Sequence, residues 1–335
     1  MKKKMFYFFI VSLIILLNSI ACNHPVKELK FGQERTLHAQ EYTIPELIIP
    51  HFITLQKDYL VFLQANPVKD HKIFAFFNLP DMRMAFEYGT IGRGKEEFLI
   101  PMFCGSSSDS LLYVWGKPDL KKITKYEIDT SGKKISPLKE ISLKKYETFN
   151  QMYVIGDSVV IYNAMPMELA IKRINVADNT TQRVDFKTLG TNSTYEPNSV
   201  IISSNNNYIA ACYRFQKKLT IYNTNLKVIS EIKWKKDDNL RKMIERDFES
   251  LVFHYVNIYC TDKYIYALYR GKTSKEYEDK GYTGDIMEVF DFKGAPVARY
   301  SFEKSPVLFV VDKNNQKIYG YNSMSENKIL VYDLT

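Results

Sequence analysis

Two histidines and two asparagines stand near the starts of four apolar segments, where imidazole and amide groups could bind a polar ligand or a metal ion. They are His51, Asn150, Asn198 and His254. A hard cation such as Ca²⁺ requires several oxygen ligands, and these four positions supply no carboxylate. The pair His51 and His254 could in principle hold a transition metal. We expect instead that the four side chains bind water or a polar ligand, and that the protein carries no metal or other cofactor.

Sequence motifs for covalent or nucleotide chemistry are lacking. The chain contains no G-x-S-x-G motif, and none of its cysteines has a recognisable catalytic context. Gly89, Gly94 and Lys95 have the spacing of a phosphate-binding P-loop, but Glu96 stands where that loop needs Ser or Thr to hold Mg²⁺. The sequence therefore argues against nucleotide binding, and an enzyme is the less favoured interpretation.

The composition indicates a folded, sheet-rich protein. The 335 residues include 24 Tyr and 21 Phe but only 14 Gly and 12 Pro, and aromatic residues favour strands over disorder. The formal net charge is +8. Without Lys2–Lys4, which belong to a segment that we expect to be removed, 43 basic residues face 38 acidic ones. This mild excess is spread along the chain, so we expect a solvated surface and no binding of nucleic acid.

Residues 1–21 have the pattern of a secretory signal peptide. The basic residues Lys2–Lys4 precede an apolar core from Met5 to Leu17, which is shorter than the about 20 residues of a membrane-spanning helix. Small and polar residues follow, and Cys22 comes directly after Ala21, an arrangement similar to a bacterial lipoprotein cleavage site. Ordinary cleavage would leave Cys22 as a free thiol. We favour lipidation of Cys22, because two acyl chains on an N-terminal cysteine give stable anchoring.

With Cys22 lipidated, residues 22–30 form a short tether and residues 31–335 the folded domain. The tether lacks the acidic run that resembles a surface-export signal in lipoproteins of the Bacteroides group. We therefore expect a lipid-anchored protein of the cell envelope that faces the periplasm rather than the cell surface. Whether the inner or the outer membrane holds the anchor stays open.

The other three cysteines, Cys104, Cys212 and Cys260, fall in predicted strands at a spacing unlike that of a metal site. We expect buried free thiols. A disulfide between Cys212 and Cys260 is the alternative in an oxidising compartment, and it stays open.

An internal repeat of about fifty residues fills the rest of the chain. Each unit has an Asp or Asn turn followed at once by an aliphatic and aromatic strand, and successive turns are 51, 48, 50, 55 and 53 residues apart. The turn residues are Asp58, Asp109, Asp157, Asn207, Asp262 and Asn315. Two more strands follow in each unit, and one precedes the turn. Four short strands in each of six repeats predict an all-β fold, a six-bladed β-propeller. A pair of two-sheet sandwiches would not explain the constant period.

The N-terminal part of the domain is predicted to close the ring. The last unit ends at Thr335, one strand short, and Glu34–Tyr42 can supply the missing strand. Closure removes the open sheet edge that a linear array would leave. The innermost strand of each blade would line a central channel, so His51, Asn150, Asn198 and His254 are predicted to lie at one mouth of it.

Two insertions interrupt the repeat. Residues 237–251 predict a helix that Asp237 or Asp238 can cap. Its apolar residues share one face and are Leu240, Met243, Ile244, Phe248 and Leu251. We expect this face to pack on the edge of blades four and five, with docking of a partner as the alternative. Residues 271–284 predict a charged hairpin loop.

Residues 89–101 join the first two units, between a strand over residues 83–88 and one over residues 100–104. The glycines suit backbone conformations with positive φ, and Phe98 can fill the gap between two sheets. Gly92, Arg93, Gly94 and Phe98 are therefore predicted to form a structural loop rather than a catalytic one.

Three segments resemble a known family. They are Gly92-Arg93-Gly94 with Glu97, Phe98 and Pro101, then residues 267–271 (ALYRG) and residues 289–294 (VFDFKG). With them the chain resembles the TolB-like six-bladed propeller lipoproteins of the Bacteroides group, within the wider NHL-like propellers. It departs from the family pattern at Lys95-Glu96, where Pro-Gly is usual. The resemblance extends over the chain after Cys22 and implies a fold and a membrane-anchored location, but no reaction.

Three functions stay open at this point. We favour a membrane-anchored, monomeric module that binds a protein or a glycan without catalysis, by analogy of fold. A hydrolase or lyase with its site at the channel mouth is the second, and the missing carboxylates argue against it. The third is a structural assembly factor of the envelope that presents the helix of residues 237–251.

Overall fold

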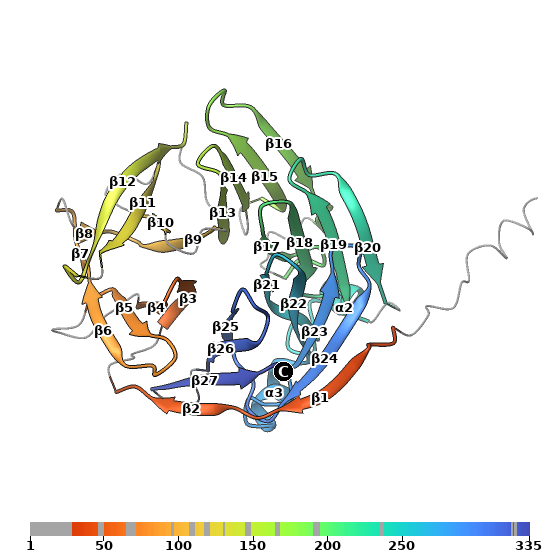
Figure 1. Cartoon of the computed structure of the whole chain (residues 1–335). Coiled ribbons are helices and arrows are strands. Elements are labelled where there is room, and N and C mark those ends of the chain that lie inside the picture. The colour runs from red at the N-terminus through yellow and green to blue at the C-terminus, as the bar shows by residue number, and fades with distance from the viewer. Residues whose placement is uncertain are drawn as a thin grey trace, which may run out of the picture.

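The computed structural model describes residues 29–45, 50–64, 72–94, 97–106, 111–116, 121–129, 131–144, 149–164, 168–189, 195–234, 238–322, 324 and 327–335. Within these ranges the chain forms a ring of β-sheets around a central axis (Figure 1). The predicted signal peptide, Cys22 and most of the tether lie outside the described residues. Among the described residues no helix is long and apolar enough to cross a membrane.

The strands follow the predicted repeat, and each repeat forms one blade. Within a blade the chain runs from the innermost strand to the outermost one. Blade 1 contains β3 (Pro50–Gln56), β4 (Tyr59–Gln64), β5 (Phe74–Asn78) and β6 (Met84–Tyr88). Blade 2 contains β9 (Met102–Ser106), β10 (Leu111–Trp115), β11 (Lys122–Asp129) and β12 (Lys134–Ser142). Blade 3 contains β13 (Gln151–Ile155), β14 (Val159–Asn163), β15 (Ala170–Asn175) and β16 (Thr181–Asp185).

The second half of the ring repeats this order. Blade 4 contains β17 (Val200–Ser204), β18 (Tyr208–Tyr213), β19 (Lys218–Asn223) and β20 (Val228–Lys233). Blade 5 contains β21 (Phe253–Cys260), β22 (Tyr264–Lys272), β23 (Ile286–Asp291) and β24 (Pro296–Phe302). Blade 6 contains β25 (Leu308–Val311), β26 (Lys317–Tyr321) and β27 (Lys328–Asp333). Consecutive strands within a blade pair antiparallel.

The second strand of a blade is covered on both faces, which explains its nearly continuous apolar sequence. All six residues of β4 are buried, and so are five of the six residues of β18. Outer strands such as β20 expose alternate side chains to solvent. The main cores lie between neighbouring blades and combine, for example, side chains of blades 1 and 2. Aromatic residues on second strands, including Tyr113, Trp115, Tyr162 and Tyr213, are buried in these cores.

The N-terminal segment closes the ring, but it does so with two strands rather than one. β2 (Gln40–Thr43) pairs antiparallel with β27 and supplies the fourth strand of blade 6, as the sequence predicts. β1 (Gln33–Leu37) instead pairs parallel with β24 and adds a fifth strand to blade 5. Figure 1 shows both strands, in red, along the outside of the two last blades. The single strand expected over residues 34–42 is therefore divided between two blades.

Blades 2 and 3 are joined into one eight-stranded sheet at the centre of the ring. The innermost strands β9 and β13 pair in parallel over Gly105 and Ser106 with Tyr153 and Val154. A Cβ atom on Gly105 would lie 2.3 Å from the ring of Tyr153, so only glycine permits this approach. Tyr153 Oη then donates to the Ile202 carbonyl of blade 4 at 3.1 Å. This contact draws the inner strands of three blades together.

The loop between blades 1 and 2 contains a short parallel pair, β7 (Thr90–Ile91) and β8 (Glu97–Phe98). Phe98 lies between the two blades, with its ring 5.0 Å from that of Phe74 and 6.1 Å from that of Tyr126. Gly89 has a positive φ of 81°, whereas Gly92 and Gly94 do not. Those two instead leave room for the Glu97 carboxylate, which accepts a hydrogen bond of 2.6 Å from the Gly94 N–H. Lys95 and Glu96 lie outside the described residues.

Both insertions differ from prediction. The expected helix of residues 237–251 is only α2 (Asn239–Glu245), because Arg246 takes a left-handed conformation and ends it. Asp238 is at the N-cap position but makes no side-chain capping bond, and Asp237 lies outside the described residues. The expected hairpin loop of residues 271–284 contains α3 (Ser274–Asp279), which begins with a capping box of Thr273 and Glu276.

The cysteines of the blades are buried free thiols. Cys104, Cys212 and Cys260 are unpaired by disulfides, so the alternative bridge between Cys212 and Cys260 does not form in this structure. Burial raises the pKa of the Cys260 thiol to about 12, and it raises the pKa values of the other two as well. Thiols held in the neutral form act here as small apolar side chains.

Candidate functional site

A cavity lies at the mouth of the ring where the innermost strands end, which we call the strand-end mouth. Its volume is about 270 Å³, slightly below the roughly 300–1,000 Å³ of typical small-molecule sites. Residues from five blades line it. They are Leu55, Lys57, Leu79, Ser106, Ser204, Asn205, Tyr259, Cys260, Thr261, Asp262, Val311, Asp312, Lys313, Asn314 and Tyr319.

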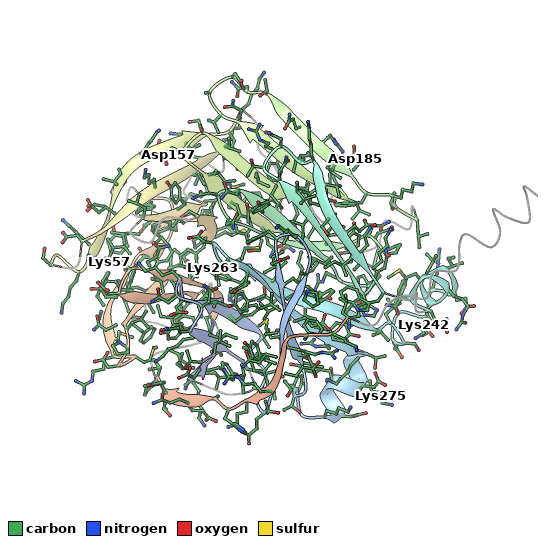
Figure 2. The ribbon with its side chains drawn as sticks, turned by 45° about the vertical axis from the view of Figure 1, so that its right-hand side comes forward. Lys57, Asp157, Asp185, Lys242, Lys263 and Lys275 are labelled. Atoms are coloured by element: carbon green, nitrogen blue, oxygen red, sulfur yellow. The ribbon has the colours of Figure 1, made fainter. Side chains whose placement is uncertain are left out.

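Polar and apolar side chains together form the wall of this cavity, and its rim is charged. Val311 and Tyr319 are buried at the wall, while Lys57, Asp262 and Lys313 are exposed at the rim. Figure 2 labels Lys57 and Lys263, which lie in the turns of blades 1 and 5 on this side of the ring. Side chains of both charges therefore surround one small depression.

Hydrogen bonds between blades fix the polar part of the rim. The Asn205 side-chain amide of blade 4 donates to the Thr261 carbonyl of blade 5 at 2.9 Å. The Thr261 hydroxyl in turn donates to Asn315 Oδ1 of blade 6 at 2.7 Å. Asn205 Oδ1 also accepts the backbone N–H groups of Asn207 and Tyr208, which holds its turn. The rim from blade 4 to blade 6 is thus preorganised and is not a set of independent loops.

The turn residues of the repeat take part in a second kind of interblade bond. Asp157, in the turn of blade 3, accepts from the Tyr113 hydroxyl and from Lys125 Nζ, both of blade 2. The Lys125 hydrogen bond, followed by that of Tyr113, lowers the pKa of Asp157 below its ordinary value. Asp157 is therefore held as a carboxylate in a contact between blades 2 and 3.

A buried charge cluster joins blades 4 and 5 on the outer side of the inner strands. Glu288 is fully buried and accepts from Lys217 Nζ at 3.0 Å and from the Tyr255 hydroxyl at 2.8 Å. Lys217 Nζ lies over the rings of Trp234 and Tyr269, at 4.8 and 4.1 Å from their centroids. These partners offset the free-energy cost of burying the charges, so the cluster stabilises the contact between blades 4 and 5.

The described residues show no metal-binding constellation. No group of three or more His, Cys, Asp or Glu side chains has a suitable arrangement among them. Asp312, on the cavity rim, uses Oδ1 to accept the backbone N–H groups of Gln316 and Lys317. The carboxylate thus shapes a turn.

The four residues predicted to bind a ligand lie at the opposite mouth, where the innermost strands begin, which we call the strand-start mouth. His51 is exposed in β3, and Asn150 is exposed just before β13. Asn198 donates to the Lys187 carbonyl at 2.7 Å. His254 is buried at the start of β21, with its ring 5.8 Å from that of Tyr269. None of the four lines the cavity at the strand-end mouth.

The residues predicted for docking on the helix are divided between core and surface. Met243 is buried with Phe215 and Leu251, and Phe248 stacks on Tyr195 at 4.9 Å. Leu240 and Ile244 are exposed. Because the helix has only two turns, the five apolar residues do not form one continuous face. Figure 2 shows Lys242 of α2 on the side of the ring away from Lys57.

Sequence analysis did not predict the cavity at the strand-end mouth, although the repeat contains a signal for it. Each repeat carries its Asp or Asn turn directly after the innermost strand, so the five turns that the structure describes lie on the same side of the ring as that mouth. The turns were interpreted only as connections between strands. α3 also had a signal, the spacing of Thr273 and Glu276 that marks a capping box.

Comparison with known proteins supports the architecture. A family described as TolB-like 6-blade propeller-like matches residues 29–314. A solved protein from Bacteroides fragilis NCTC 9343 is 11% identical, with a TM-score of 0.52 over 90% of this chain and 98% of that one. A member of the DUF4221 family from Bacteroides vulgatus ATCC 8482 is 13% identical, with a TM-score of 0.50 over 89% and 97%. The WD40 repeats of RRP9 are 6% identical, with a TM-score of 0.50 over 85% and 80%.

These structural likenesses show the fold alone, because the identities are low. No curated protein gives a significant match. The family match covers most of the chain and agrees with the six repeats, the strand order and the closure of the ring. The chain therefore belongs to the TolB-like 6-blade propeller-like family.

Proposed function

We propose that the protein is a lipid-anchored binding module of the cell envelope, which recognises a protruding loop of a partner protein at the strand-end mouth. The observation that carries the proposal is the cavity formed there by five blades. Propellers present such sites on a rigid scaffold while the activity resides in the site. The anchoring part rests on the sequence of residues 1–22.

The chemistry of the rim favours a protein over a neutral glycan. Lys57 and Lys313 offer cations and Asp262 a carboxylate around a wall of polar and apolar side chains. A protein loop brings both signs of charge and an apolar side chain, and complementary charges give an interface its specificity. The small volume suits one inserted side chain better than a whole small molecule.

Site-specific photo-cross-linking in the native envelope tests the proposal. A photoreactive amino acid is placed at Lys57 or at Asp262 on the rim, and at Asp185 or Lys275 as controls on the other side of the ring (Figure 2). We expect one protein to be captured from both rim positions and from neither control. Capture from the controls alone, or equal capture from all four positions, would contradict binding at this mouth. A shift in the melting temperature caused by soluble glycans, without protein capture, would assign the cavity to a glycan instead.

The anchor is tested separately through Cys22→Ser. We expect the variant to leave the membrane fraction and to lose incorporation of labelled palmitate, while its purified domain melts at the same temperature as the wild type. A variant that stays in the membrane fraction would refute lipid anchoring at this residue. Capture from the rim is expected to weaken in this variant, because the anchor places the cavity near its partner.

A further inference from the structure

Arg214 occupies a fixed position at the strand-start mouth, between blades 4 and 5. It directly follows β18, the strand whose end pairs with the start of β17. Its backbone N–H donates to the Ser199 carbonyl at 2.9 Å, and its carbonyl accepts the His254 N–H at 2.7 Å. The backbone of Arg214 therefore bridges the two blades, and its side chain starts from a defined point.

The Arg214 guanidinium lacks a partner in the described structure. Its Nε atom is buried without a hydrogen-bond acceptor. None of the ion pairs found among the described residues includes Arg214. A guanidinium has five N–H donors, and buried donors without acceptors are uncommon in folded proteins. The Nε atom is itself buried, but the residue as a whole is partly exposed at the mouth, so an acceptor from solution would bind the outer N–H groups of the guanidinium.

A second arginine lies near the first. Burial, followed by the charge of Arg270, lowers the pKa of Arg214. The Arg270 guanidinium donates two hydrogen bonds to the buried carboxylate of Asp285, with N–O distances of 3.3 and 3.1 Å. Its guanidinium stacks on the ring of Tyr277 at 3.5 Å. Asp285 thus balances Arg270 and leaves the charge of Arg214 uncompensated.

The groups around Arg214 do not supply the missing acceptor. The Gln216 side-chain amide donates to the Pro197 carbonyl at 2.7 Å, so a nearby carbonyl is already used. Lys217, the next cation along the chain, is paired with Glu288. Among the described residues, no side chain forms an ion pair with Arg214 or accepts a hydrogen bond from its Nε atom.

We propose that Arg214, supported by Arg270, forms a binding site for an oxyanion, a carboxylate or a phosphate group, at the strand-start mouth. A guanidinium binds two oxygens of either group through parallel N–H bonds, which a lysine cannot do. The oxyanion neutralises the excess charge between the two arginines. The site is at the other end of the ring from the proposed protein-binding cavity and stands independently of it.

Calorimetric titration and thermal unfolding of the full chain carrying Cys22→Ser test this site. Sodium phosphate and sodium glucuronate are compared with sodium chloride at matched ionic strength, so that general salt effects cancel. We expect at least one of the two oxyanions to raise the melting temperature above that in chloride and to give a saturable heat of binding. Phosphate alone would indicate a phosphorylated ligand, and glucuronate alone a carboxylate.

Two variants of Arg214 and one control assign the effect. Arg214→Gln is expected to weaken the binding of the active anion at least tenfold, and Arg214→Lys to weaken it by less. Arg183→Gln removes an exposed guanidinium of β16 that already pairs with Glu168, and it should bind like the wild type. If Arg214→Gln does not fold, Arg214→Lys supplies the comparison. Absence of any oxyanion effect in the wild type, or equal affinity in both Arg214 variants and the wild type, would overturn the proposal.

Discussion

The Tyr113 hydroxyl of blade 2 donates a hydrogen bond of 2.6 Å to the Asp157 carboxylate in the turn of blade 3. The same relationship recurs between blades 5 and 6, where the Tyr266 hydroxyl donates to Asn315 Oδ1 at 3.1 Å. Both acceptors are the Asp or Asn turn residues of the repeat, and both donors lie on the second strand of the preceding blade. The repeated turn residue therefore connects blades as well as starting a strand.

Removing this hydroxyl should destabilise the ring moderately. In Tyr113→Phe the ring stays packed, but Asp157 loses one donor while it keeps Lys125. We expect the free energy of unfolding to fall by about 1 kcal/mol, the usual worth of such a hydrogen bond, as measured by urea denaturation. Tyr282→Phe is the control, since the Tyr282 hydroxyl makes no hydrogen bond to the described residues and its loss should change little. Equal effects of both substitutions would show that the interblade bond contributes nothing.

Asp157 should make stability depend on pH in the acid range. Its pKa is lower in the folded protein, first because of the Lys125 hydrogen bond. Such a carboxyl group stabilises the fold above its unfolded pKa, near 3.8, and this contribution is lost as the pH falls through the lower folded value. Asp157→Asn should therefore be less stable than the wild type at pH 7, and the difference should shrink below pH 3.8.

Urea denaturation at several pH values between 7 and about 2 measures this difference. Asp58→Asn, at the equivalent turn of blade 1, is the matched control because Asp58 is exposed. A gap between wild type and Asp157→Asn that stays constant down to the lowest pH would contradict the assignment of Asp157 as the titrating group.

Glu288 should be among the most sensitive polar residues of the chain. It is fully buried, and Glu288→Gln would leave Lys217 and Arg299 with uncompensated charges between blades 4 and 5. Removing one partner of a buried ion pair costs about 3–5 kcal/mol, so we expect a loss of that order in the free energy of unfolding. Glu245→Gln breaks only an exposed pair with Arg241 and should cost less than about 1 kcal/mol. A small effect at Glu288 would mean that Tyr255 and the two aromatic rings are sufficient to hold Lys217.

The fold could be predicted because its information is local and repeated. Each Asp or Asn turn precedes an apolar strand, and six such units of four short strands at a nearly constant period are typical of a propeller. The closing role of the N-terminal segment was predicted because the last repeat unit has three strands instead of four. The division of that segment into β1 and β2 depends on where it crosses from blade 5 to blade 6, and no sequence pattern records that crossing.

The sites were harder to predict because they combine residues that are far apart in the chain. The cavity takes single residues such as Lys57, Ser106 and Asp262 from separate turns, and none of them stands out within its own repeat. Arg214 and Arg270 lie near each other only because blades 4 and 5 are neighbours. The helix of residues 237–251 was overestimated for a local reason, since the left-handed conformation of Arg246 is set by packing and not by a glycine.

Phe98 provides the most direct test of the joint between blades 1 and 2. Its side chain is 1% exposed and contacts the rings of Phe74 and Tyr126. Phe98→Ala should cost about 3–5 kcal/mol, because the cavity it leaves is enclosed by two rigid sheets. Ile91→Ala, in the same loop but 46% exposed, should cost less than about 1 kcal/mol.

Gly92→Ala separates the role of Phe98 from that of the loop backbone. An added Cβ atom would meet only the carboxylate end of Glu97, which can turn away, so we expect a mild effect on the free energy of unfolding by urea. If Gly92→Ala lowered the free energy of unfolding as much as Phe98→Ala, the hydrogen bond from the Gly94 N–H to Glu97 would be the main stabilising contact of the joint. A severe effect at Phe98 alone would instead identify the aromatic contact across the two blades as the reason the ring remains closed at this point.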